Sequence, residues 1–268
     1  MDRVCACIIA RLNSTRLSRK VLADIKGKPL LKWIVDRLNA VDNVDEVVLC
    51  TSSDPGDEEL LEHADDWGIP AIAGSPTNIV SRLQQAASTV DADILLRATG
   101  DNPLISVEYT ERMVAAHKKS DFEYSRVNSL PLGATVEGLS KGLLPKIQET
   151  LPSPSHSEYL VLYAYQPERY NCVVLQPPDE IQRPHYSVTV DTPDDLERAR
   201  EIYGETAWRS DIGPSIDQVI QFLDEDENYE EIPGDTMIKM PEQGRIPYND
   251  FLDLLKDRAV ESTTITFN

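Results

Sequence analysis

The chain has 268 residues, 41% of them hydrophobic, and its 46 acidic side chains outnumber its 26 lysines and arginines, for a formal net charge of −20. This length and hydrophobic content suffice for one α/β domain, or for one domain with a further C-terminal segment. The charge argues against nucleic acid as a partner, because the phosphate backbone would be repelled; a nucleotide is still allowed where a local cationic loop overrides the overall field.

The cysteines and the hydropathy pattern predict a cytoplasmic protein with reduced thiols. Cys5, Cys7, Cys50 and Cys172 lie in apolar, strand-like runs without the spacing of metal ligands. We therefore interpret them as buried free thiols rather than as a metal or redox site. No secretory signal is recognised, and no apolar run approaches the roughly 20 residues of a membrane span. No membrane partner is expected.

The acidity has two interpretations. Only 10 of the basic residues are lysines, and acidic residues are spread along every predicted helix. Strong acidity keeps a protein soluble in concentrated salt, where screening removes the self-repulsion. A salt-adapted protein is the favoured interpretation, and an ordinary acidic enzyme is the alternative that stays open.

The first half of the chain alternates strand and helix patterns with short connections. Short apolar runs predict strands over 4–10, 46–52, 69–74 and 93–99, and amphipathic patterns predict helices over 29–41, 56–68 and 77–90. Pro29 fits a first helical turn, and Gly68 fits a helix C-cap. Repeated βα units predict a three-layer α/β/α, Rossmann-like fold with a mostly parallel sheet.

The second half is more mixed. The patterns predict a helix over 107–120, a strand over 122–127, helices over about 139–150 and 155–166, and strands over 172–176 and 185–190. The last of these strands is expected to run into a helix with Asp191 at the junction, and a further helix begins at Pro214 or Ser215. We predict a main domain over 1–228 and a partly irregular C-terminal extension over 229–268, with a short docking helix over 250–260 and a frayed tail.

Four polar or basic side chains follow the first predicted strand: Arg11, Ser14, Arg16 and Lys20. A loop between a buried strand and a helix favours anions, because backbone N–H groups point into it and guanidinium and ammonium groups neutralise the charge. Neither the glycine spacing of a P-loop nor a GxGxxG pattern is present. The cluster predicts a polyphosphate site, and the alternative is a solvated turn with scattered arginines.

Two carboxylates follow predicted strands elsewhere in the chain. Asp101, in RATGDNPLI, lies where ligands bind at the carboxyl edge of open α/β sheets, although Gly-Asp-Asn-Pro is also turn-prone by composition. Asp191, in TVDTPDDLE, is not needed for capping, because Thr192 can cap the helix and Pro193 fits its first position. The two carboxylates can share one Mg²⁺, which prefers a few oxygen ligands.

Taken together, these strings resemble the cytidylyltransferase superfamily. The loop pattern reads roughly Ala-Arg-x-x-Ser-x-Arg-Leu-Pro-Gly-Lys, and the chain matches it except at Ser18 and Arg19. The likeness extends from about residue 4 to about residue 230 and is strongest to the spore-coat-polysaccharide-type enzymes; acylneuraminate and 3-deoxy-manno-octulosonate cytidylyltransferases are similar more distantly. Leu132, Ser155 and Ser187 also depart from residues that the family often has, Asp, Glu and Arg respectively. These departures fall mostly in the presumed sugar half, so they bear on sugar identity more than on nucleotide use.

The resemblance implies a nucleotide-diphospho-sugar transferase type of fold, with a small β/α insertion over the sugar, and a role for each matching residue. Nucleotide-binding residues would be Arg11, Ser14, Arg16, Lys20, Arg82 and Arg97; catalytic residues Lys20, Arg16 and Asp101; metal ligands Asp101 and Asp191; and sugar-binding residues Asn128, Glu137 and His156. Taken by itself, a histidine at a helix start is more often a cap or packing residue than a base.

The resemblance implies that a hydroxyl of an acidic, 2-keto-3-deoxy, nonulosonate-like sugar attacks the α-phosphorus of CTP. The products would be pyrophosphate and a CMP-sugar for a surface glycan, with Mg²⁺ as cofactor and a homodimer as an assembly left open. One alternative is a glycosyltransferase of GT-A-like fold, but Asp91-Ala92-Asp93 precedes its strand, at the wrong edge for that metal motif. The other is a non-catalytic, nucleotide-binding scaffold subunit, for which Ser18-Arg19 is the best support.

Overall fold

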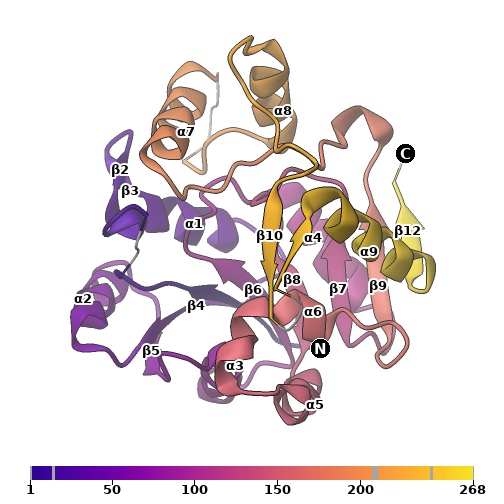
Figure 1. The fold of residues 1–268 in the computed structure, drawn as a ribbon. Helices are drawn as coiled ribbons and strands as arrows, with labels where there is room; N and C mark the ends of the chain where they lie inside the picture. Colours follow the sequence, from indigo (N-terminus) through magenta and orange to yellow (C-terminus); the bar gives the residue numbers. More distant parts are fainter. Residues whose placement is uncertain (1, 14–15, 207–210, 242–243, 268) are drawn as a thin grey trace.

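The computed structural model describes residues 2–13, 16–206, 211–241 and 244–267, and its centre is one eight-stranded sheet (Figure 1). The strand order is β12-β9-β7-β8-β6-β1-β4-β5, and every strand but β8 runs in the same direction. The strands are β1 (Val4–Ile9), β4 (Glu46–Ser52), β5 (Ala71–Gly74), β6 (Ile94–Thr99), β7 (Tyr124–Val127), β8 (Glu137–Ser140), β9 (Cys172–Gln176) and β12 (Thr263–Thr266). The prediction of a mostly parallel sheet is confirmed.

Two small hairpins lie outside the sheet, formed by β2 (Asp24–Ile25) with β3 (Lys28–Pro29) and by β10 (Met237–Met240) with β11 (Gly244–Pro247). The helices are α1 (Leu30–Asn39), α2 (Glu58–Asp66), α3 (Ile79–Thr89), α4 (Val107–His117), α5 (Leu143–Thr150), α6 (Leu160–Ala164), α7 (Pro193–Glu205), α8 (Ile216–Glu225) and α9 (Tyr248–Val260). In the described part of the chain, no helix is long and apolar enough to cross a membrane.

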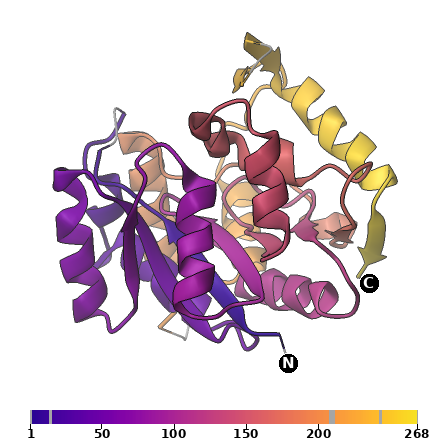
Figure 2. The same cartoon turned by 90° about the horizontal axis from the view of Figure 1, so that it is seen from below.

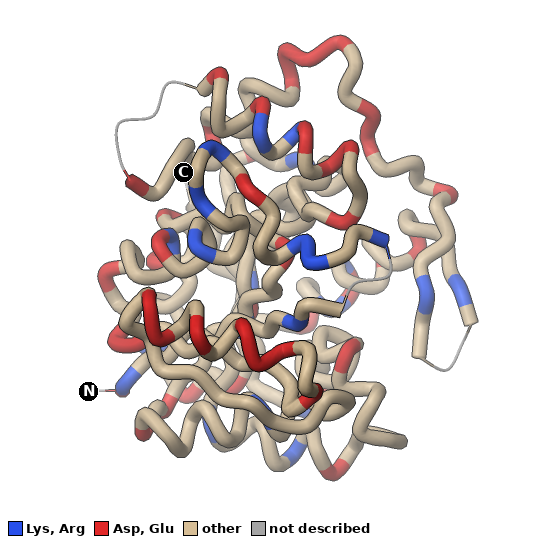
Figure 3. The backbone as a smooth tube through the Cα atoms, turned by 90° about the vertical axis from the view of Figure 1, so that its left-hand side faces the viewer, with Lys and Arg blue, Asp and Glu red and all other residues tan. Residues whose placement is uncertain are grey.

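The helices form a layer on each face of the sheet, so the three-layer prediction is also confirmed. Alternate residues of β1 point to opposite faces: Val4, Ala6 and Ile8 belong to the core shared with α1, α2, α4, α7 and α8, while Cys5 and Cys7 belong to the core shared with α3, α5, α6 and α9. The four cysteines are buried and free, as predicted. Asp and Glu positions are spread over all parts of the fold (Figure 3).

Three sequence predictions are wrong. The segment 185–190 is not a strand. It forms an isolated β-bridge, which pairs Ser187 with Leu132. Val188 N–H and Val190 N–H donate to Leu132 O and Asp101 O, so this backbone pairs with loops at the edge of the sheet. Residues 139–142 belong to β8 and the turn after it, and α5 begins at Leu143. The expected frayed tail forms β12, which pairs with β9.

His117, the last residue of α4, is buried in one tautomer. Its Nδ1 lies 2.9 Å from Ser125 Oγ and its Nε2 lies 3.0 Å from Ser140 Oγ. Because Ser140 Oγ donates its own proton to Phe122 O, it accepts from Nε2–H, and Ser125 therefore donates to Nδ1. Burial lowers the pKa of His117 from 6.5 to about 4, so the folded protein holds the neutral ring.

We expect His117 to cost the protein about 2 kcal/mol of unfolding free energy when the pH falls from about 7.5 to about 5. The unfolded chain binds a proton at this histidine below pH 6.5, whereas the folded chain does so only near pH 4. The stability that the neutral His117 ring contributes is therefore fully present above pH 6.5, and it is lost as the pH falls from 6.5 towards 4. Urea titrations at both pH values should show a loss about 2 kcal/mol smaller for His117→Gln than for the wild type. Equal losses would contradict the assignment.

Candidate active site

The cationic loop between β1 and the hairpin β2–β3 is fixed by a buried carboxylate. Asp57 is fully buried at the start of α2, and its Oδ1 accepts from the backbone N–H of Leu12 at 2.7 Å. The hydroxyl of Ser52, at the end of β4, donates to the other carboxylate oxygen. Asp57 therefore ties the loop to the end of the neighbouring strand, and the sequence analysis did not single it out.

Lys20 brings together the two carboxylates that the sequence predicted as metal ligands. Its Nζ donates to Asp101 Oδ2 at 2.9 Å and to Asp191 Oδ1 at 2.6 Å. Asp101 lies just beyond β6, and Asp191 lies just before α7. Arg16 adds a second cation, with its Nη2 2.9 Å from Asp191 Oδ1. We call these four residues the Lys20 cluster.

Local capping leaves Asp191 free for this role. Thr192 Oγ1 accepts from Asp195 N–H, and the Asp195 carboxylate accepts from Thr192 N–H, which completes a capping box at the start of α7. Asp195 also accepts from the backbone N–H of Asp191, so the orientation of Asp191 is set while its side chain does no capping. The predicted cap at Thr192 is confirmed.

The electrostatics of the Lys20 cluster keep the ammonium charged. Burial alone would lower the pKa of Lys20, but the adjacent charges of Asp101 and Asp191 and their hydrogen bonds outweigh it and raise the pKa. Lys20 is only 12% exposed, against 26% and 27% for the two carboxylates. The oxygens of both carboxylates thus converge on one position, which the ammonium group of Lys20 occupies.

That convergence fits Mg²⁺. Two carboxylates aimed at one position supply hard oxygen ligands, and Mg²⁺ usually keeps several waters and substrate phosphates besides one or two carboxylates. Within the described residues, no group of three or more histidines, cysteines or acidic residues forms a larger metal cluster. Asp101 and Asp191 are therefore suited to a metal that is completed by phosphate oxygens.

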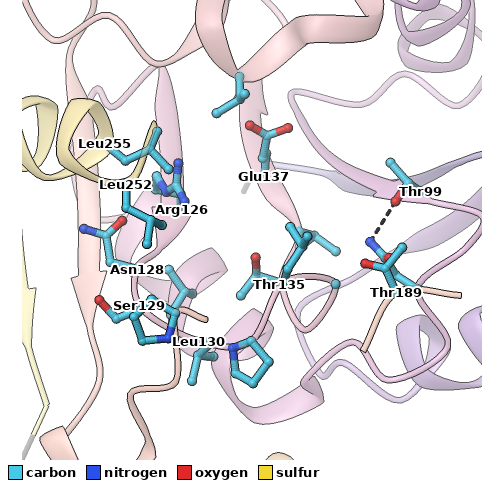
Figure 4. A pocket seen from close by; sticks show the side chains of 18 of the residues that line it. Thr99, Arg126, Asn128, Ser129, Leu130, Thr135, Glu137, Thr189, Leu252 and Leu255 are labelled. Carbon is cyan, nitrogen blue, oxygen red and sulfur yellow. Dashed lines mark hydrogen bonds between the residues drawn. The ribbon is translucent and has the colours of Figure 1, made fainter. Parts of the chain in front are cut away.

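A cavity of about 390 Å³ opens next to the cluster and shares Asp101 with it. Its lining comes from β6, β7, β8 and the loops beyond them, and from α9 (Figure 4). Glu137 is held there through both oxygens, since Arg97 Nη1 and Tyr124 Oη each donate to it at 2.6 Å. Asn128 and Arg97 also line the cavity. Four of the predicted residues, Arg97, Asp101, Asn128 and Glu137, therefore line one pocket.

The structure does not bring every predicted residue to this place. Arg11 donates to Pro76 O at 3.0 Å and pairs with Glu158, and His156 contacts Ser153 Oγ at 2.6 Å in a 3-10 helix outside the pocket lining. Arg82 is 1% exposed and donates to Cys50 O. Ser14 lies outside the described residues.

The sequence analysis missed part of the pocket wall. Arg126 of β7 and five residues of α9 line the cavity: Tyr248, Phe251, Leu252, Leu255 and Lys256. A charged residue inside the apolar run FEYSRV was a usable signal for Arg126. For α9 the signal was only an amphipathic pattern, which does not say what the helix covers.

Arg19 occupies the glycine position of the family loop and adopts the backbone conformation that glycine favours. Its φ is 55° and its ψ is 28°, in the left-handed region, and its guanidinium pairs with Glu59 at 2.5 Å on the surface. The loop thus keeps a left-handed backbone at this position, which suits glycine. The same conformation is strained for arginine, because arginine has a Cβ atom.

We expect Arg19→Gly to be more stable than Arg19→Ala by about 1 kcal/mol. Both variants lose the exposed ion pair with Glu59, so their difference isolates the strain of a left-handed residue that has a Cβ atom. Chemical denaturation of the two variants and the wild type measures it. Equal stability of the two variants would show that the loop relaxes to another conformation.

A mostly parallel sheet with a cationic loop and two converging carboxylates at its carboxyl edge defines a nucleotide-binding transferase of the Rossmann-like α/β class. Comparison with known proteins gives the particular family. Residues 5–149 match the cytidylyltransferase family, and the chain therefore belongs to that family. It is a CTP-dependent nucleotidyltransferase.

The relatives agree with this assignment over most of the chain. The spore coat polysaccharide biosynthesis protein SpsF of Bacillus subtilis is 28% identical over 221 residues, 80% of this chain and 92% of that protein. A 3-deoxy-manno-octulosonate cytidylyltransferase of Acidobacterium capsulatum is 27% identical over 198 residues, 67% of this chain and 79% of that protein. The structure of a cytidylyltransferase from Leptospira borgpetersenii has a TM-score of 0.75 at 25% identity and covers 84% of this chain and 94% of that one.

Proposed function

We propose that the protein transfers the cytidylyl group of CTP to a small acidic sugar, giving a CMP-sugar for a surface polysaccharide. The observation that carries the proposal is the pocket that opens from the Lys20 cluster at Asp101. A transferase needs its second substrate beside the phosphate site, and this cavity has the size of a small-molecule site and carries guanidinium groups. Relatives named for spore coat polysaccharide and for 3-deoxy-manno-octulosonate support the substrate class.

In the proposed reaction, a sugar hydroxyl attacks the α-phosphorus of CTP. The new O–Pα bond forms as the bond between the α-phosphorus and the bridging oxygen breaks, pyrophosphate leaves, and the hydroxyl proton passes to solvent. Chemistry of this kind depends mostly on positioning and on neutralising charge at the phosphates.

The residues of the cluster have matching roles in this proposal. Lys20 and Arg16 would contact the triphosphate oxygens once CTP displaces them from the carboxylates. Mg²⁺ held by Asp101 and Asp191 would neutralise phosphate charge and favour departure of pyrophosphate. Glu137 fixes Arg97 at the pocket wall through the 2.6 Å bond between them, so that the acceptor meets a rigid surface.

The glycosyltransferase alternative has weaker support. Asp93, from the Asp91-Ala92-Asp93 sequence, accepts a hydrogen bond from Arg3 N–H at 2.9 Å, which places it at the amino end of β6, next to the start of β1. The Lys20 cluster lies at the other edge of the sheet, where β6 ends and Asp101 follows. A metal motif at the amino edge would be separated from the phosphate site.

The test is release of pyrophosphate from each of the four nucleoside triphosphates, with Mg²⁺, against a panel of acidic sugars at low and molar KCl. We expect release from CTP with at least one acidic sugar, and higher activity in molar KCl if the acidity reflects salt adaptation. A folded protein that binds CTP but releases no pyrophosphate with any sugar would favour the scaffold alternative.

A further inference from the structure

In the pocket beside the Lys20 cluster, a guanidinium lies next to an apolar wall formed by α9. Arg126 and Asn128, from β7 and the residue that follows it, line one side, and Leu252 and Leu255 of α9 lie next to them (Figure 4). Glu137 and Thr135 face them from the β8 side of the cavity (Figure 4). A ligand on the α9 side of the cavity therefore meets a cation and an apolar surface next to each other.

Arg126 is a cation without a counter-ion. Across the described ranges of the chain, no carboxylate pairs with it: its guanidinium lies 5.2 Å from the ring centroid of Tyr165, and its Nε is buried without a hydrogen-bond partner. By contrast, Arg97 in the same lining is neutralised by Glu137. A half-buried guanidinium that lacks an anion is costly, and an anionic ligand in the pocket would remove that cost.

The apolar wall is held firmly in place. Tyr248 Oη donates to Pro184 O at 2.7 Å at one end of α9. At the other end, Arg258 donates to the backbone carbonyls of Val161 and Leu162, and β12 pairs with β9. Figure 2 shows α9 (yellow) beside the red segment that contains α6. Because α9 is anchored near both of its ends, its apolar side chains form a fixed surface.

We infer that the pocket binds its acceptor in two parts: the carboxylate of an acidic sugar at Arg126, and an apolar substituent of that sugar, such as an acyl group, against Phe251, Leu252 and Leu255 of α9. Helix α9 is then the wall that selects the acceptor. This inference rests on the proposed function, which makes the pocket the acceptor site. A cavity of about 390 Å³ has room for one sugar of this kind.

Direct binding tests the cationic half without requiring turnover. Calorimetric titrations use N-acetylneuraminate and 3-deoxy-manno-octulosonate as probes, with a non-hydrolysable CTP analogue and Mg²⁺ present. We expect Arg126→Gln to weaken binding of both probes about ten-fold or more, Arg126→Lys to weaken it less, and the CTP analogue to bind all three proteins alike. Arg169→Gln is the matched control, because Arg169 also lies over a tyrosine ring, Tyr170 at 5.5 Å, but outside the pocket lining.

A second pair of variants tests the apolar half. We expect Leu252→Ala to reduce the preference for the N-acetylated probe over the non-acylated probe about five-fold. Leu254→Ala removes the same volume from the same helix at a position that does not line the pocket, and it should leave the preference unchanged.

The outcomes separate this inference from the proposed reaction. A wild type that binds neither acidic sugar would overturn the inference, and so would an Arg126→Gln variant that binds both probes as the wild type does. If Arg126→Gln does not fold, Arg126→Lys is used in its place. The inference is then overturned if Arg126→Lys binds both probes as the wild type does and Leu252→Ala keeps the wild-type preference between the probes. Binding that follows the expected pattern without pyrophosphate release would count against the reaction and would support the assignment of the pocket.

Discussion

Asp101→Asn is expected to lower kcat for pyrophosphate release by about 10²–10³-fold and to leave the melting temperature nearly unchanged. The substitution keeps the shape of a side chain that is about one-quarter exposed but removes one of the two charges that converge on Lys20. The Mg²⁺ concentration required for half-maximal activity should rise as well, because one of the two proposed anionic ligands is lost. Steady-state rates measured against Mg²⁺ concentration test both effects.

Asp194→Asn is the control for that experiment. Asp194 is an exposed carboxylate in the first turn of α7, three residues from Asp191, and it should affect activity little while costing the helix a few tenths of a kcal/mol, roughly, through the helix dipole. Equal losses of activity in the two variants would mean that general acidity near α7, rather than the position of Asp101, supports the reaction.

Lys20→Met is expected to have two effects of opposite sign. Activity should fall by about 10²–10³-fold, because the cation that we propose to contact the phosphates is lost. Binding of Mn²⁺ to the nucleotide-free protein should become about ten-fold tighter, because the ammonium, 2.9 and 2.6 Å from Asp101 and Asp191, no longer competes for those oxygens. Rate measurements and a Mn²⁺ titration followed by electron paramagnetic resonance measure the two effects.

The matched control is Lys32→Met, since Lys32 also pairs with a carboxylate, Asp36 of α1, away from the cluster. It should change neither activity nor Mn²⁺ binding. Weaker Mn²⁺ binding in Lys20→Met than in the wild type would show that Asp101 and Asp191 do not share a metal position, and would remove the competition that this prediction assumes.

The parallel sheet could be predicted from the sequence because its information is local. Runs such as VCACIIA are too short and too apolar for exposed helices, and the βα alternation restricts the topology. The convergence of Asp101 and Asp191 was predicted by the same logic, because Asp101 follows a strand and Asp191 was expected to follow one. That Lys20 lies between the two carboxylates was not predicted. The segment 185–190 failed this logic: its alternation is that of a strand, but it pairs with the loop at Leu132 and lacks a neighbouring strand on each side.

Long-range contacts explain what the sequence could not give. Nothing near Arg126 in the sequence indicates that α9, more than 120 residues away, covers the same cavity. The resemblance assigned a sugar contact to His156, but its local contacts with Ser153 and Tyr163 have a packing character. Burial likewise separates Arg82 from the exposed arginines of the loop, and a sequence pattern does not distinguish a buried guanidinium from an exposed one.

The pairing of β12 with β9 has a consequence for how the chain is made. A ribosome completes every residue of the Lys20 cluster before it reaches residues 248–266, so β9 is an outermost strand until β12 emerges. β9 reads Cys-Val-Val-Leu-Gln and is almost fully buried, whereas β12 reads Thr-Thr-Ile-Thr and is mostly exposed. An apolar open strand is a template for aggregation. Once residues 263–266 are made, β12 covers the apolar β9, and the edge strand of the sheet becomes polar. The same pairing anchors α9.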